Sequence, residues 1–230
     1  MKWPRILKTW FLGLFGHREH VAVDGGIRPS GRLVAQKLST DGTQAIRVAN
    51  SQKRSSAADL SSEGNPSFSI EGPSPQGEAD TLDVCKVLVQ KLNLEGGQWD
   101  EPVKPEGRET GIDCFSSDGQ QDLNIQVTRA VSDQNIWREL GQTRTVTEET
   151  TIQDAADSLF QRARDKSRGL PRDQLANTIL AINAMDTASH SLSVVIDDFR
   201  KRYGPAVRQL GFKEVWAVGP LETLTERLDR

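Results

Sequence analysis

The stretch Leu123-Asn124-Ile125-Gln126-Val127-Thr128 alternates apolar and polar residues without interruption. Successive side chains of a strand point to opposite faces, so the three apolar residues predict a core face and the three polar residues the other face. Upstream, the sequence Gly-Ile-Asp-Cys-Phe at residues 111–115 predicts a partner strand, and Asp118-Gly119 between the two predicts a hairpin turn. Asp113 in the partner strand then needs a partner or a metal ion, because an unpaired buried carboxylate is costly.

The regions around this hairpin predict helices where apolar residues recur every three or four positions, and strands where short apolar runs occur. Thr151 with Asp154 resembles a capping box at the start of one helix. The resulting order is helix, two or three strands, helix, strand, helix, strand, which predicts an α/β domain over residues 78–230. The predicted helices cover about 78–96, 152–168 and 192–210, a weak strand covers about 99–103, and the later strands cover 178–182 and 214–218.

Two N-terminal segments differ in composition from this domain. Residues 1–28 form an amphipathic segment, in which residues 3–15 place apolar side chains at helical spacing with basic residues between them. Such a helix can touch a membrane surface, or it can dock on the folded domain or on a partner chain. Residues 29–77 are rich in Ser, Gly, Gln, Pro and Asp, which predicts a flexible linker.

The overall composition limits the functions that need to be considered. The 29 basic and 32 acidic residues of the 230-residue chain give a net charge of −3, so any contact with nucleic acid must be local. Cys85 and Cys114 lack metal-ligand spacing and are expected to be reduced, which fits the cytoplasm. No stretch approaches the roughly 20 apolar residues of a membrane span, so we expect a cytoplasmic protein that is at most peripheral to a membrane.

The order of elements, with Asp113 on one hairpin strand and a polar i, i+2 pair on the next, resembles the PD-(D/E)xK superfamily of restriction-endonuclease-like nucleases. The resemblance covers residues 78–220 and implies a restriction-endonuclease-like core with a mixed central sheet flanked by helices. Asp113 matches the first acidic position of the family motif. Gln126 matches the Asp, Glu or Gln of the next strand, and Thr128 stands where the family has its catalytic lysine. A hydroxyl cannot replace an ammonium as a charge stabiliser, so catalysis would need a lysine from elsewhere.

The resemblance also implies where the missing lysine and the metal ligands would come from. Family members sometimes move the lysine to the following helix, where Lys166 is the candidate. A second carboxylate often comes from the first helix, where Glu78 is the candidate, and the Val127 carbonyl could complete the shell with Asp113 and Gln126. Mg²⁺ or Mn²⁺ held by these oxygens would polarise a phosphate and activate water.

Simpler interpretations remain open for the same residues. Glu78 could be a first-turn acid favoured by the helix dipole, and Lys166 a cation favoured near a helix C-terminus. Gln126 and Thr128 could be ordinary strand residues. Three functions therefore stay open. The first is a divergent nuclease acting on DNA or RNA, and the second is a catalytically inactive nuclease-fold domain that binds nucleic acid or a protein partner. The third is an interaction module tethered through the N-terminal helix.

Overall fold

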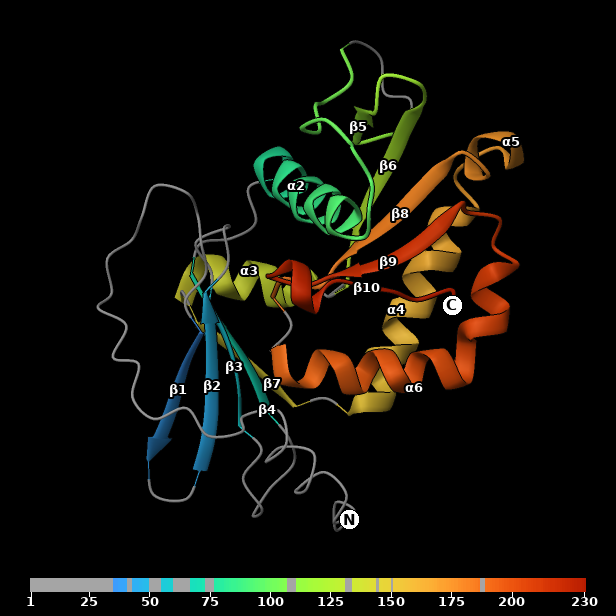
Figure 1. The fold of residues 1–230 in the computed structure, drawn as a ribbon. Coiled ribbons are helices and arrows are strands. Elements are labelled where there is room, and N and C mark those ends of the chain that lie inside the picture. Colours follow the sequence, from blue (N-terminus) through green and yellow to red (C-terminus); the bar gives the residue numbers. More distant parts are fainter. Residues whose placement is uncertain are drawn as a thin grey trace. The chain divides into compact units, whose positions relative to one another are not determined.

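A computed structural model of the chain defines its fold (Figure 1). The chain divides into two units, residues 1–30 and 31–230, and every described residue belongs to the second unit. The predicted amphipathic helix at residues 3–15 lies outside the described residues. The structure describes residues 35–40, 43–49, 55–59, 67–72, 77–106, 111–130, 134–143, 145–149, 151–186 and 189–230.

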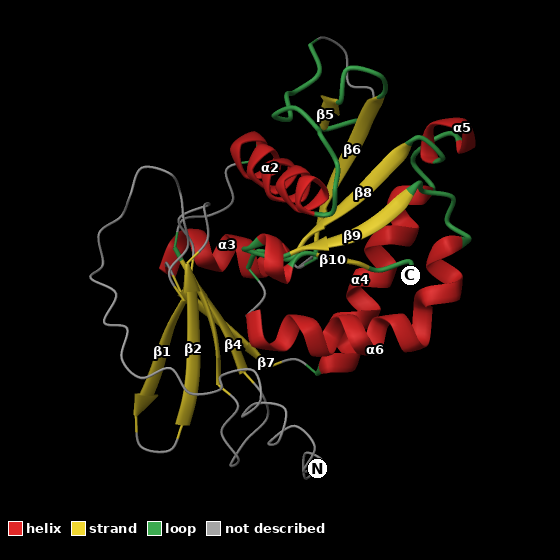
Figure 2. Cartoon of the chain, viewed as in Figure 1, coloured by secondary structure: helices red, strands yellow, loops and turns green. Residues whose placement is uncertain are grey.

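A five-stranded mixed sheet contains the hairpin predicted from the sequence (Figure 2). Strands β6, β8 and β9 run parallel, and β5 and β10 pair antiparallel with β6 and β9 at the two ends of the sheet. In place of the predicted strand at residues 99–103, a single bridge joins Val103 to Phe115. The strand order is β10 (Glu226–Arg227), β9 (Glu214–Val218), β8 (Thr178–Asn183), β6 (Asp122–Arg129) and β5 (Cys114–Ser117).

Helices cover both faces of this sheet. Helix α2 (Glu78–Leu94) packs on one face through a core that includes Cys114, Ile125, Ile179 and Trp216. Helices α4 (Ile152–Ser167) and α6 (Ser189–Arg208) pack on the other face. The predicted α/β fold with a mixed sheet flanked by helices is therefore confirmed.

The central strand β8 explains why both faces need a cover. All six of its residues are buried, and they alternate between the two cores: Ile179 and Ala181 face the α2 side, while Leu180 and Ile182 face the α4 and α6 side. A continuous apolar run is typical of a parallel strand that is buried on both faces. None of the described helices is long and apolar enough to cross a membrane.

The short connecting elements were not predicted from the sequence. Most of them are too brief to give a clear pattern, whereas α3 has a helical periodicity that was overlooked. They comprise α3 (Gln134–Thr143), β7 (Thr145–Glu149), α5 (Arg172–Leu175) and the 3-10 helix η1 (Glu222–Leu224).

A second, antiparallel sheet occupies part of the range that was interpreted as a flexible linker. Its strands follow one another in chain order and end on β7, which pairs with β4. Small and polar residues dominate these strands, as in Ser55–Asp59, so their composition suggested a linker. For these residues the structure has strands where the sequence predicted a flexible linker. The strands are β1 (Ala35–Thr40), β2 (Thr43–Ala49), β3 (Ser55–Asp59) and β4 (Ser67–Glu71).

Candidate functional site

Asp113 lies at the open end of the β5–β6 hairpin, directly before β5, and Gln126 lies within β6. Cys114 pairs with Ile125 in the antiparallel register, and the Asp113 N–H donates to the carbonyl oxygen of this same Ile125 at 2.9 Å. The regular register therefore ends at Cys114, because hydrogen bonds of an antiparallel ladder join directly opposite residues. The Asp113 side chain reaches the backbone of Val127, the residue that follows Gln126.

The Asp113 carboxylate is held in place by the backbone of the neighbouring strand. Its Oδ2 atom accepts a hydrogen bond of 2.7 Å from the Val127 N–H, in a part-buried position. Its Oδ1 atom accepts no hydrogen bond from the described residues. The carboxylate is thus oriented by one oxygen and retains the other as an acceptor.

Gln126 contributes a buried oxygen whose hydrogen-bonding capacity is unused. The residue is 5% exposed, and its Oε1 atom has no hydrogen-bond partner within the described part of the chain. Leaving a buried acceptor unsatisfied costs about 1–3 kcal/mol, so such a group calls for a structural or functional reason. A bound cation or donor beside Asp113 would satisfy this oxygen.

Helix α4 covers the sheet face that carries the polar side of β6. Gln126 pairs with Leu180 and Thr128 with Ile182 in the parallel register, and Leu180 and Ile182 belong to the core beneath α4. Thr128, the predicted counterpart of the family lysine, therefore shares the Gln126 face. Near the other end of β6, the Ser158 Oγ atom donates to the Ala130 carbonyl oxygen at 3.1 Å and fixes α4 to this strand.

The C-terminal end of α4 lies beside the segment that precedes Asp113. A Cβ atom placed on Gly111 would be 2.7 Å from the Leu170 Cδ2 atom, so Leu170 packs directly against the Gly111 backbone. Lys166 precedes Leu170 by one helical turn. The fold thus brings the residues that follow α4 to the segment that leads into Asp113.

Two half-buried cations follow Ser158 along α4 at intervals of four residues, Arg162 and Lys166. Residues four apart share one face of a helix, so both extend the stripe that begins at the Ser158 contact with β6. Neither side chain has a hydrogen bond or ion pair with the described residues. Arg162 was not predicted from the sequence, although its spacing of four from Lys166 was a visible signal.

Glu78 is the first residue of α2, as expected for a first-turn acid. Its side chain lies outside the described residues. The α2 helix itself packs on the sheet face opposite to Gln126 and Thr128. The structure therefore joins Asp113 to Val127, the neighbour of Gln126, by a hydrogen bond, and it places Lys166 on α4, the helix that covers the Gln126 face.

The donor set decides whether a metal ion could be held here. Among the described residues there is no group of three or more His, Cys, Asp or Glu side chains that could hold a metal. Mg²⁺, however, is often bound through one or two carboxylates together with waters and substrate phosphates. The Asp113 carboxylate and the unsatisfied Gln126 Oε1 are oxygen donors of the type that Mg²⁺ prefers.

The two cysteines lie close to this site but are structural. Both are free and fully buried, Cys85 on α2 and Cys114 on β5, and their side chains are hydrogen-bonded to each other. Burial raises the pKa of Cys85 well above its usual range, and the neighbouring Cys114 and the charge of Asp113 raise it further. A thiol that stays protonated is a poor nucleophile and a poor metal ligand.

Comparisons with known proteins add little to this description. No protein-family model and no curated protein matches the chain. One solved structure that is similar is SfsA of Pyrococcus furiosus in complex with Ca²⁺, at 10% identity and a TM-score of 0.27, covering 85% of this chain and 91% of that one. A similarity at this level carries no conclusion about fold or function, so the function must be inferred from the site itself.

Proposed function

We propose that this chain is a divergent metal-dependent nuclease that hydrolyses phosphodiester bonds of DNA or RNA. The observation that supports this best is the buried, unsatisfied Oε1 atom of Gln126, the residue next to the Val127 N–H that orients the Asp113 carboxylate. The cations Arg162 and Lys166 have no ion pair with the described residues and lie on the helix that covers the Gln126 face, so they add a second feature expected of a phosphate-binding site.

The proposed roles follow from the charges of these groups. Mg²⁺ or Mn²⁺, when bound, would polarise the phosphate and lower the pKa of a water. Asp113 and Gln126 would hold the ion, and the Val127 N–H keeps the Asp113 carboxylate oriented. Lys166, with Arg162, would stabilise negative charge that develops on the phosphate. Thr128 would only line the site, because its hydroxyl carries no charge.

A nuclease assay with charge-matched variants tests the proposal. Plasmid DNA, single-stranded DNA and RNA are incubated with the protein and Mg²⁺ or Mn²⁺. Asp113→Asn keeps an acceptor for the Val127 N–H and should abolish cleavage without unfolding the protein. Lys166→Met should lower the rate about 100-fold, the usual effect of removing one electrostatic stabiliser.

Lys201→Met is the matched control, because Lys201 is an exposed cation on α6 without an ion pair to the described residues. Equal losses in Lys166→Met and Lys201→Met would contradict a specific role for Lys166. Gln126→Glu provides a readout besides activity. It adds a carboxylate beside Asp113, so Mn²⁺ should raise the melting temperature of this variant more than that of the wild type.

The second candidate is a non-catalytic domain of the same architecture that binds nucleic acid or a protein. Thr128 in place of a strand lysine favours it. Salt-sensitive DNA binding that does not respond to Mg²⁺, without cleavage of any of the three substrates, would support this function over the nuclease.

A further inference from the structure

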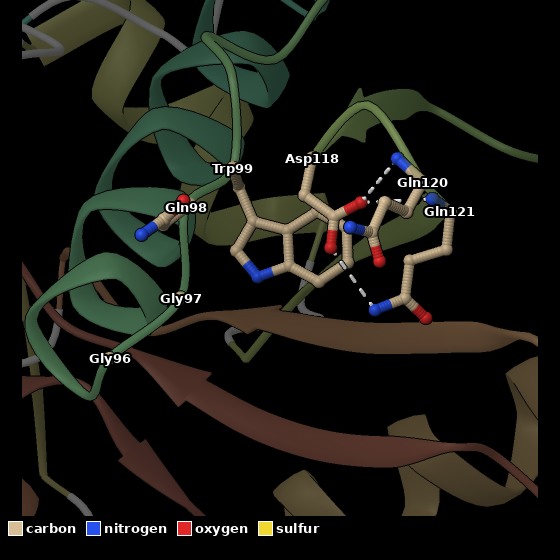
Figure 3. A pocket seen from close by; sticks show the side chains of 7 residues that line it. All are labelled: Gly96, Gly97, Gln98, Trp99, Asp118, Gln120 and Gln121. Carbon is tan, nitrogen blue, oxygen red and sulfur yellow. Dashed lines mark hydrogen bonds between the residues drawn. The ribbon is translucent and has the colours of Figure 1, made fainter.

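A cavity at the tip of the β5–β6 hairpin lies apart from the residues discussed above. It has a volume of about 320 Å³ and lies between the end of α2 and the hairpin turn. Figure 3 shows the Trp99 indole among the lining residues, with the Asp118 carboxylate beside it and the Gln98 side chain pointing away. The lining residues are Gly96, Gly97, Gln98, Trp99, Asp118, Gln120 and Gln121.

Trp99 is held rigidly in this cavity. Its backbone N–H donates to the Asn93 Oδ1 atom at 2.7 Å, and its carbonyl oxygen accepts from the Asn93 Nδ2 atom at 2.9 Å. A Cβ atom on Gly97 would be 2.7 Å from the Trp99 Cδ1 atom, so the indole packs directly on the Gly97 backbone. The half-buried ring also packs against the core beneath α2, so it presents a fixed aromatic wall.

Asp118 supplies a fixed negative charge next to this wall. Its Oδ1 atom accepts from the backbone N–H groups of Gln120 and Gln121, both at 2.9 Å, and its Oδ2 atom accepts from the Gln121 Nε2 atom at 3.2 Å. The Gln121 and Gln120 backbone N–H groups lower the pKa of this carboxyl below its usual value. Asp118 is therefore ionised at neutral pH, with acceptor capacity left over.

No cation of the described residues neutralises this site. The lining residues include no Lys or Arg. The Arg230 guanidinium lies 5.9 Å from the ring centroid of Trp216, whereas Trp99 has no such cation within the described chain. An unneutralised carboxylate also repels the phosphates of a nucleic acid, so a nucleotide is a poor candidate for this cavity.

We propose that the Trp99–Asp118 cavity binds an organic cation, of the ammonium or guanidinium class. The electron-rich face of an indole attracts a cation, and tryptophan is the most effective of the aromatic residues in this role. Asp118 adds the opposite charge, and the side-chain carbonyl oxygens of Gln120 and Gln121 add acceptors for N–H donors. This site is independent of the proposed nuclease site.

Titrating the protein with choline and with its neutral isostere 3,3-dimethylbutan-1-ol tests whether binding at this cavity requires the positive charge or only the shape of the ligand. The readout is the indole N–H resonance of Trp99 in a ¹H–¹⁵N spectrum of the full chain, assigned with Trp99→Phe. Choline should shift this resonance with a dissociation constant in the millimolar range, as expected for one cation–π contact with one carboxylate. The isostere at the same concentration should not.

Asp118→Asn should weaken choline binding about fivefold while keeping acceptors for the turn. Asp122→Asn, which removes an exposed carboxylate of the same hairpin outside the cavity, should leave binding unchanged. Arginine amide in place of choline distinguishes a guanidinium from a quaternary ammonium. The proposal would be overturned by an isostere shift as large as the choline shift, or by the absence of a shift with both choline and arginine amide. A shift with glucose but with neither cation would also overturn it.

Discussion

Gly219, just after β9, is a residue whose lack of a side chain is required by its neighbours. A Cβ atom at this position would collide with the Leu224 carbonyl oxygen and lie 2.9 Å from the Leu224 Cβ atom. The main clash is with backbone, which cannot rotate away. We therefore expect Gly219→Ala to lower the free energy of unfolding by about 1–3 kcal/mol, which is the usual cost of overpacking a core.

Urea denaturation followed by circular dichroism measures this change. Gly169→Ala is the control, because its Cβ would make an ordinary contact of 3.5 Å with the Lys166 carbonyl oxygen. A Gly219→Ala variant as stable as Gly169→Ala would mean that the segment from β9 to η1 can move aside.

Helix α4 is the element that connects the proposed site to the rest of the fold, and its N-terminus is capped. The Thr151 Oγ1 atom accepts from the Asp154 N–H at 3.0 Å and donates to the Asp154 Oδ2 atom at 2.6 Å. Thr151→Ala should lower the free energy of unfolding by about 1 kcal/mol, because one of the first N–H groups of the helix loses its acceptor.

Gln153→Ala, at an exposed position in the same first turn, is the matched control and should change stability by less than about 0.5 kcal/mol. Equal effects of the two substitutions in urea denaturation would argue against the cap. Because Ser158, Arg162 and Lys166 lie on this helix, a loss of nuclease activity in Thr151→Ala would mean that the position of α4 on β6 matters for catalysis.

The elements differ in how far they could be predicted. Helix α4 has a capping residue and an apolar stripe of Ala156, Leu159 and Ala163, so its bounds followed from local pattern. The antiparallel strands β1–β4 have mostly small and polar residues, and they looked like linker. Their sheet closes on β7, a strand that follows α3 much later in the chain. Pairing between such distant segments is invisible to a local pattern.

The molecule as a whole protects its two thiols, Cys85 and Cys114, which are both fully buried. Reaction with a thiol reagent requires exposure and a thiolate, and burial opposes both. Under native conditions we expect Ellman's reagent to react far more slowly than with a free thiol, at a rate that rises with urea because opening limits it. In concentrated denaturant both thiols should react at once. Rapid labelling of the native protein would show that α2 separates readily from the sheet.

The candidate site combines features that the sequence predicted with features that only the tertiary structure decided. Asp113 reaches the Val127 N–H because a hairpin with an Asp-Gly turn has a definite register, and that register depends only on residues 111–128. The alternation in β6 likewise set which residues share a face. These features were predictable because backbone pairing and side-chain periodicity within a short segment do not depend on the rest of the fold.

Tertiary packing decided the remainder. Which helix covers the polar face of β6, and hence the place of Arg162 and Lys166, depends on the core that α4 shares with β8 and α6. The cavity at Trp99 depends on the turn after α2 meeting the tip of the hairpin. Both arrangements arise from contacts between segments far apart in the chain. Their energies come from burial and packing, which local propensity does not encode.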